Sequence, residues 1–398
     1  MTRARFNKTQ GRFRASAVAI LAAVAASAAA CGGGGGAATT STTTSTLPPL
    51  PAKVFAYVAL AGSGGNLGFG STMVQVDLTT GSEGVGQRTH VGTYPDAVAV
   101  TPDGRLALVA NFSSNTVTPV ELPSGKALPA IDAGAGPAGI AITPNGSTAY
   151  VTDDGSLSSL GNTVTPIDLT TMKVLSPITV GDGPQGIVIT PDGSKAFVAD
   201  DGNAALSGQP GSIGHQVTPI DLATGKAGTP INVGNGPLGI AVTPDGSTVY
   251  VTNLDSESVS PINVSTMQAG APVAVEGGPL AVVVGHGSAW VVDAPAVGQV
   301  GNNLQPILIT TNTAGKAIAL PKGAQGAAVS PNGLVAWVVC LNSDRLSPVN
   351  LVTRRVGTPI LIAGGPVAVA VADQPQGPAP TTTTTVAPKK KKRTTTTT

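Results

Sequence analysis

Asp and Asn recur at one position of an internal repeat, and they are the side chains best suited to chemistry. A short apolar stretch occurs seven times and ends in Asp or Asn in five copies: Asn111, Asp153, Asp200, Asn253 and Asp293. The other two copies end in Leu60 and Cys340. Because Ca²⁺ prefers oxygen ligands, this pattern predicts a crown of oxygens for a calcium ion or a polar ligand. The alternative is that each Asp or Asn begins a turn by bonding its own backbone.

Two acidic doublets are the stronger metal candidates within this set. Asp153-Asp154 and Asp200-Asp201 close neighbouring copies of the repeat, and Asp293 closes a third. Calcium is the one ion that the pattern suggests, and no other cofactor is expected. Asn111, Asn253 and His215 are further candidates for contacts with a ligand.

Histidine and cysteine give no sign of a catalytic centre. The three histidines, His90, His215 and His286, fall on an outer strand and on two opposite faces of the repeat. They cannot converge on one metal ion, and no Gly-x-Ser-x-Gly or phosphate-binding motif accompanies them. Cys340 ends an apolar run and is expected to be a buried, inert thiol. No catalytic residue is therefore predicted.

These residues are positioned by a repeat that spans most of the chain. An anchor of the type Gly-Pro-x-Gly-Ile-x-Val begins near residues 94, 136, 183, 236, 278, 323 and 365. The anchors lie 42 residues apart where nothing is inserted. After six of them come a turn such as TPDG, a strand such as TVYVTN (248–253), and a segment such as TPIDL (218–222). Four short strands in about 40 residues are typical of one β-propeller blade.

Proline and tryptophan occupy fixed places within this unit. A proline recurs in the third segment at positions 119, 166, 219, 261, 306 and 348. Because proline cannot donate to a β-ladder, we expect it at the beginning of the third strand. Trp290 and Trp337 stand at equivalent positions of second strands, where they are expected to pack between blades.

The last anchor lacks the other three strands, and these are found at the N-terminal end of the repeat region. The segments 54–60, 74–78 and 87–92 match the second, third and fourth strands. The sequence therefore predicts an all-β, seven-bladed β-propeller over 52–373, closed by N- and C-terminal strands in one blade. This arrangement removes two open sheet edges.

The string YVTN, present at 250–253, with PDG turns and PID segments, resembles the YVTN β-propeller repeat family. The resemblance covers roughly 54–373, and it implies a propeller fold and a cell-envelope or surface-layer setting. It implies little about function, because propellers serve in binding, scaffolding and catalysis.

The repeats differ in length at one connection. Four of the seven units carry extra residues between the second and third strands, within 60–75, 153–166, 200–219 and 293–306. These insertions all fall on one face of a propeller, and elaborated loops on a regular scaffold often carry function. We expect an envelope protein, a glycan or a small molecule to bind on this face.

The two ends of the chain have the composition of targeting and linker segments. Residues 1–30 join a basic stretch to 14 apolar or small residues, which is typical of a signal peptide. Cys31 follows Ala28-Ala29-Ala30 and resembles the lipidated cysteine of bacterial lipoproteins; the alternative is cleavage that leaves a free thiol. Residues 31–51 form a Gly/Thr/Pro-rich linker, and 374–398 a disordered tail with a basic run at 389–393.

Together these features predict an exported protein on the outer face of the membrane, anchored by lipid on Cys31. The segment 52–373 holds 12 basic and all 21 acidic residues, so it is unsuited to binding nucleic acid. We expect a monomer that acts as a non-catalytic binding or scaffold module. The alternative is a hydrolase, such as a lactonase, with a metal site at the propeller axis.

Overall fold

The computed structural model describes residues 53–62, 70–80, 88–156, 159–202, 213–294 and 301–373. The predicted signal peptide, the linker, the tail and Cys31 lie outside these residues. The described residues contain no helix of the length and hydropathy needed to span a membrane.

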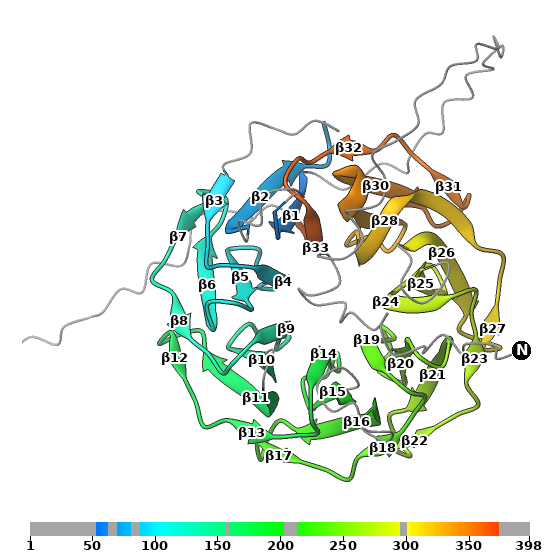
Figure 1. Cartoon of the computed structure of the whole chain (residues 1–398), viewed down its shortest axis with the longest axis horizontal. Coiled ribbons are helices and arrows are strands. Elements are labelled where there is room, and N and C mark those ends of the chain that lie inside the picture. Colours follow the sequence, from blue (N-terminus) through cyan, green and yellow to red (C-terminus); the bar gives the residue numbers. More distant parts are fainter. Residues whose placement is uncertain are drawn as a thin grey trace, which may run out of the picture.

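Seven four-stranded blades form a ring in which the first strand of each blade faces the axis (Figure 1). We name them A to G in chain order. Blade A contains β33 (Pro366–Asp373), β1 (Val54–Leu60), β2 (Thr72–Asp77) and β3 (Arg88–His90), from the axis outward.

The next four blades follow one pattern, and in each of them the outermost strand is split into two short pieces. Blade B contains β4 (Pro95–Val100), β5 (Leu106–Asn111), β6 (Thr116–Glu121), β7 (Lys126–Ala127) and β8 (Ile131–Asp132). Blade C contains β9 (Pro137–Ile142), β10 (Thr148–Gly155), β11 (Leu160–Asp168), β12 (Lys173–Val174) and β13 (Ile178–Thr179). Blade D contains β14 (Pro184–Ile189), β15 (Lys195–Gly202), β16 (Ile213–Asp221), β17 (Lys226–Ala227) and β18 (Ile231–Asn232). Blade E contains β19 (Pro237–Val242), β20 (Thr248–Asn253), β21 (Ser258–Asn263), β22 (Gln268–Ala269) and β23 (Val273–Ala274).

The last two blades are joined into one sheet of nine strands by the 12-residue β28. Blade F contains β24 (Gly278–Gly285), β25 (Ser288–Ala294), β26 (Gly301–Leu308) and β27 (Thr313–Ala314). Blade G contains β28 (Ile318–Val329), β29 (Val335–Cys340), the short 3₁₀ helix η3 (Leu341–Ser343), β30 (Arg345–Asn350), β31 (Arg355–Val356) and β32 (Ile360–Leu361).

The long β28 has a simple sequence explanation. Its N-terminal part is the outer strand of blade F, and its C-terminal part is the inner strand of blade G. Ala324 stands where the other six anchors have proline, and it pairs with Gly301 of β26. An alanine can take part in such a ladder on both sides, whereas proline has no N–H to donate.

Terminal strands close the ring as the sequence predicts. β1 pairs with β33 in antiparallel fashion from Val54–Asp373 to Leu60–Pro366. The first strand of blade A therefore comes from the C-terminal end of the described chain, and its other three strands come from the N-terminal end. This pairing leaves no open edge between the first and last repeats.

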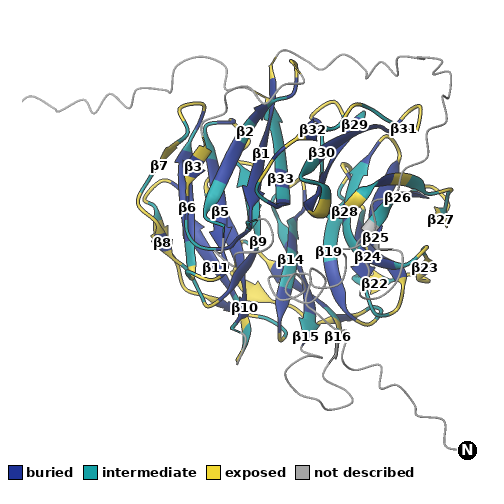
Figure 2. Cartoon of the chain, turned by 45° about the horizontal axis from the view of Figure 1, so that its top comes forward, coloured by how far each residue is buried: buried dark blue, intermediate teal, exposed yellow. Residues whose placement is uncertain are grey.

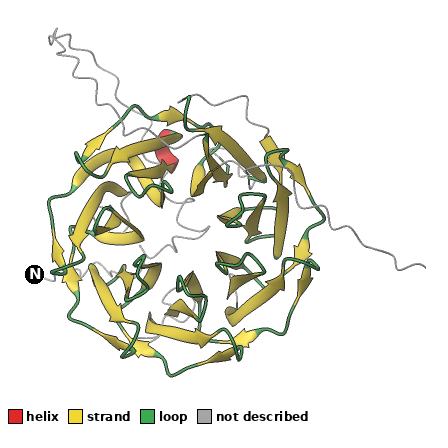
Figure 3. Cartoon of the chain, turned by 180° about the vertical axis from the view of Figure 1, so that it is seen from behind, coloured by secondary structure: helices red, strands yellow, loops and turns green. Residues whose placement is uncertain are grey.

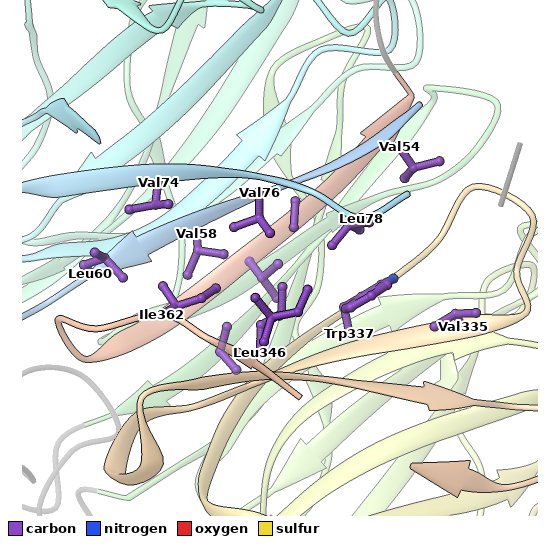
Figure 4. Close-up of a cluster of buried hydrophobic side chains, with 14 residues drawn as sticks. Val54, Val58, Leu60, Val74, Val76, Leu78, Val335, Trp337, Leu346 and Ile362 are labelled. Atoms are coloured by element: carbon purple, nitrogen blue, oxygen red, sulfur yellow. The ribbon is translucent and has the colours of Figure 1, made fainter. Parts of the chain in front are cut away.

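Hydrophobic packing lies mainly between blades. Seven of the buried clusters each join one pair of neighbouring blades around the ring. Trp337 packs against β1 and β2 at the junction of blades G and A (Figure 4). Trp290 fills the junction of blades F and G. The prediction that both tryptophans pack between blades is confirmed, and Figure 2 shows the buried strands beneath exposed connections.

The prolines correct one prediction. They lie inside the third strands and not at their beginning; Pro119, for example, is the fourth residue of β6. The carbonyl of Pro119 accepts the amide of Leu128, in the gap between β7 and β8. The ring nitrogen faces that same gap, because N–H and C=O of one strand residue point to the same side. The outer strand is thus broken where it would need the missing donor, and the same bond recurs at all six prolines.

The ring has two different faces. Tight turns between first and second strands lie on one face, which we call the turn face (Figure 3). In blade B, Asp103 accepts the Thr101 hydroxyl at 2.6 Å and the Arg105 amide at 3.1 Å, and Gly104 has φ 70°. The opposite face carries the connections between second and third strands and between blades, and we call it the hairpin face. In blades C and D this hairpin is longer, with Gly155 paired to Leu160 and Gly202 to Ile213.

Candidate functional site

The five polar residues at the ends of second strands all lie at the hairpin face, one in each of blades B to F. Each pairs with the anchor proline of its own inner strand, as Asp153 does with Pro137. All five side chains are buried, with exposed fractions between 0% and 3%. The five side chains are therefore buried, each within a different blade.

Third-strand hydroxyls bond these side chains in four blades. In blade C, the hydroxyls of Thr163 and Thr165 donate to Asp153 Oδ2 at 2.8 and 2.7 Å. In blade D, Thr218 donates to Asp200 Oδ2 at 2.6 Å.

In blades B and E the strand-end residue is an amide, and its Nδ2 donates. Asn111 Nδ2 reaches the Thr118 hydroxyl at 2.9 Å. Asn253 Nδ2 reaches the Ser258 and Ser260 hydroxyls at 3.2 and 3.0 Å. The partner in each of blades B to E includes the residue just before the repeated proline. These bonds connect the second and third strands of one blade. They differ from the bonds to neighbouring backbone that the turn alternative predicts for these Asp and Asn side chains.

A glycine of the incoming connection packs against the same side chain. A Cβ added at Gly181 would lie 2.6 Å from Asp200 Cγ, and one at Gly234 would lie 2.7 Å from Asn253 Cγ. Gly92 and Gly134 stand in the same relation to Asn111 and Asp153. The strand-end residue therefore holds the crossover between blades against the sheet, and glycine is required for this close approach.

Burial changes the acidity of the carboxyls in blades C and D. Desolvation raises the pKa of Asp153, against the lowering effect of its bonds from Thr165, Thr163 and the Gly134 amide. Desolvation raises the pKa of Asp200 to about 7, opposed by Thr218 and the Gly181 amide. Burial disfavours the charged form of a carboxyl, while donated hydrogen bonds favour it.

Blade F departs from this pattern at three positions. Asp293 is fully buried, but neither of its carboxylate oxygens has a hydrogen-bond partner. The residue before the repeated proline is Gln305, and its amide bonds elsewhere: Oε1 accepts the Glu276 amide at 2.9 Å and Nε2 donates to Gly315 O at 3.0 Å. Glu276 replaces the crossover glycine. Desolvation and then the charge of Glu276 raise the pKa of Asp293 to about 8.

The other residues singled out by the sequence do not gather at one place. Asp154 is buried beside Asp153, and Asp201 is half-buried beside Asp200. His215 is exposed on β16 of blade D, His90 lies on the outermost β3, and His286 lies in the turn between β24 and β25. Among the described residues, no three His, Cys, Asp or Glu side chains are grouped together. Cys340 is buried, as predicted, and burial raises the pKa of its thiol.

Formal charge is divided unequally between the two faces of the described residues. Twelve acidic and three basic residues lie at the hairpin face, a formal net charge of −9. Eight acidic and eight basic residues lie at the turn face, and Lys316 lies on the rim between them. The exposed acids of the hairpin face include Asp132, Asp182, Glu257 and Glu276. The imbalance is a property of the face and not of any one blade.

A groove also opens next to Asn253, between the outer strands of blades D and E. Its volume is about 520 Å³, and Ser258 and Ser260 line it together with Asn232, Gly234, Ser256 and Pro272. The two serines that bond Asn253 therefore also line this groove.

Sequence reasoning missed Glu276, Gln305 and the hydroxyls that precede the prolines. The signal was present in the repeat, because Thr or Ser precedes the proline in blades B, C, D, E and G. Aligning that position and the crossover glycine would have marked blade F as the exception among the five blades whose second strand ends in Asp or Asn.

Comparison with solved structures shows the fold. Hydrazine synthase from Kuenenia stuttgartiensis superposes with a TM-score of 0.59 at 22% identity, over 71% of this chain and 91% of that chain. A functionally unknown protein from Desulfotomaculum acetoxidans superposes with a TM-score of 0.64 at 16% identity, over 80% of this chain and 99% of that one. This chain is a β-propeller. No family model matches its sequence, and no curated protein does. Identities this low show the propeller architecture alone, since one fold serves many activities.

Proposed function

We propose that this propeller is an exported, lipid-anchored module of the cell envelope that binds its partner through the hairpin face without catalysis. The observation that carries the proposal is the charge division. Without the buried carboxyls of Asp153, Asp200 and Asp293, whose pKa is raised, nine acidic and three basic residues give −6 at the hairpin face, against balanced charge at the turn face. A face of one sign attracts partners of the opposite sign and speeds their encounter. The partner is accordingly an envelope component with a cationic surface.

The positions of the chain ends support this orientation. Val54 and Asp373 are paired, and both lie at the turn face of blade A. A linker that begins at a lipidated Cys31 would therefore reach the ring from the turn face. The hairpin face would then point away from the anchored membrane, where it is open to a partner.

The sequence supports two further parts of this proposal, the membership of the YVTN repeat family and the location at the membrane. The apolar stretch before Cys31 fits a lipoprotein signal, and the YVTN and PID strings fit the YVTN repeat family. A lipid on Cys31 together with a second acyl chain suffices for stable membrane anchoring.

A lactonase-like hydrolase with a metal at the axis is less well supported. The buried acids of blades C and D are bonded within their own blades, and the inner strands carry mostly apolar and glycine side chains.

The decisive experiment compares two charge variants of the full chain in cross-linking to intact envelope. Asp132→Lys/Asp182→Lys/Glu257→Lys reverses three exposed acids of the hairpin face, and Glu121→Lys/Asp221→Lys/Asp373→Lys reverses three acids of the turn face as the matched control. We expect the triple variant to lose the cross-linked species and the control to keep them. Equal yields from both variants would rule out the hairpin face.

Anchoring has its own test. Mass spectrometry of the mature N-terminus should find an acylated Cys31, and Cys31→Ala should move the protein from the membrane pellet to the soluble fraction. An unmodified N-terminal cysteine would refute lipid anchoring while leaving the binding face untouched.

A further inference from the structure

Blade F differs from its neighbours in the chemical character of the groups around its strand-end residue. In blades C and D, hydroxyl groups of the third strand and an amide of the crossover donate toward the buried carboxylate. In blade F the hydroxyl is replaced by Gln305, whose amide is engaged with the Glu276 backbone and Gly315. The donors are gone, and a second carboxylate, Glu276, stands where the other blades have glycine.

A buried carboxylate with no donor is costly in free energy. Asp293 is 0% exposed, and both of its oxygens lack a partner. A charged group buried in this way is normally paired, hydrogen-bonded or bound to a metal ion. The added negative charge of Glu276 makes the lone carboxylate less favourable still, unless a positive charge lies between the two.

The pairing of β25 with β26 places the side chain of Asn303 on the same side of the sheet as Asp293. Asn303 is directly opposite Asp293 in the pairing of β25 with β26. Side chains of directly opposite residues project from the same face of an antiparallel pair. The equivalent residues in blades B, C and E, which are Thr116, Thr163 and Ser258, do bond the strand-end side chain.

We propose that the carboxylates of Asp293 and Glu276, with the side-chain oxygen of Asn303, form a binding site for a divalent cation of the calcium class. Two carboxylates and an amide oxygen are hard ligands of the kind that Ca²⁺ takes, with water completing its shell. The cation neutralises Asp293 and ties the crossover that carries Glu276 to blade F. It thereby does for this blade what the hydroxyl and the glycine do for blades C and D. The site is independent of the partner on the hairpin face.

The test is calcium binding by the full chain, measured by titration calorimetry after treatment with EDTA. We expect one equivalent of Ca²⁺ with a dissociation constant on the order of 10⁻⁴–10⁻³ M, the range of extracellular calcium modules. The thermal unfolding midpoint should rise with Ca²⁺ concentration, because a ligand of the native state stabilises it.

The sharpest variant restores the arrangement of the neighbouring blades. Glu276→Gly/Gln305→Thr removes the second carboxylate and supplies a hydroxyl for Asp293, so it should fold and lose calcium binding at least about tenfold. Asp293→Asn should lose binding as well, and it keeps the shape of the side chain. Asp221→Asn, at an exposed acid of the turn face, is the control and should bind Ca²⁺ as the wild type does.

Two outcomes would overturn the proposal. One is the absence of a saturable equivalent of Ca²⁺ in the wild-type protein at millimolar concentration. The other is an equal calcium response in the wild type, Asp293→Asn and the double variant, which would place the bound ion elsewhere.

Discussion

Blades D and F place an aspartate at the same point of the same fold, yet they stabilise it by different means. Asp200 in blade D accepts the Thr218 hydroxyl at 2.6 Å and packs against Gly181. Asp293 in blade F has no donor to either oxygen and stands near Glu276 instead. A repeat thus conserves the position of a polar group while the chemistry around it changes. The repeated unit is structural in blade D, and the departure from it in blade F is where a distinct activity is to be sought.

The largest expected effect is removal of the donor in blade D. Thr218→Val leaves the buried carboxyl of Asp200 without its hydroxyl, and we expect it to lower the free energy of unfolding by about 3 kcal/mol. Denaturant unfolding at pH 8 measures the change. Thr179→Val, at an exposed position of blade C, is the control and should change stability by less than about 0.5 kcal/mol. A small loss for Thr218→Val would show that the hydroxyl is dispensable and would remove the distinction between the blades.

An intermediate effect is expected from the crossover position. Gly181→Ala places a methyl group 2.6 Å from Asp200 Cγ and should destabilise the protein by about 2 kcal/mol. Glu276→Ala, at the same position of blade F, should change stability in EDTA by no more than about 0.5 kcal/mol. Denaturant unfolding of the two variants side by side measures both changes. Equal losses would mean that the two crossovers pack alike.

The smallest effect, counted per pH unit, is a change in the pH dependence of stability. The pKa of Asp293 is raised to about 8 in the folded protein, from an ordinary 3.8. The folded state therefore keeps a proton that the unfolded state releases, so the contribution to stability is present at low pH and falls between about pH 4 and pH 8. One carboxyl changes stability by at most about 1.4 kcal/mol per pH unit in this window.

Asp293→Asn should flatten this dependence in EDTA, and denaturant unfolding at pH 4, 6 and 8 would show it. Asp200→Asn should flatten a narrower window that ends near pH 7, since the pKa of Asp200 is raised to about 7. Parallel profiles for wild type and Asp293→Asn would indicate that this carboxyl does not titrate in the window.

The architecture was accessible from the sequence because it depends on local signals that repeat. The spacing of 42 residues, the turns ending in glycine and the split terminal blade all follow from turn chemistry and alternation of apolar residues. The proline position was wrong for a physical reason. The prediction considered the third strand alone, where a proline in the interior would leave a donor missing. In the structure, the outer strand is broken opposite each proline, so no donor is needed there. The nine-stranded sheet was missed because it depends on the single replacement of an anchor proline by Ala324.

The candidate site was predicted in part. The Asp and Asn positions were identified, and so were their places at one face of the ring. Their burial and their bonds to Thr165, Thr218 or Ser260 depend on the register between second and third strands. That register is a tertiary property, and composition does not supply it. Glu276 was overlooked because a lone acid in a connection has no special pattern until its neighbour Asp293 is placed.

The closing strands of blade A have a mechanical consequence. Val54 and Asp373 are the outermost pair of the β1–β33 ladder, and the linker and the tail continue from these two residues. A pulling force applied to both ends would open the ladder one pair at a time, as a zipper opens, and would not load all of its bonds together. We expect the ring to open at blade A under tension well below that needed to shear another blade. Single-molecule pulling, with a disulfide between Ala56→Cys and Val371→Cys as the locked control, would measure the difference.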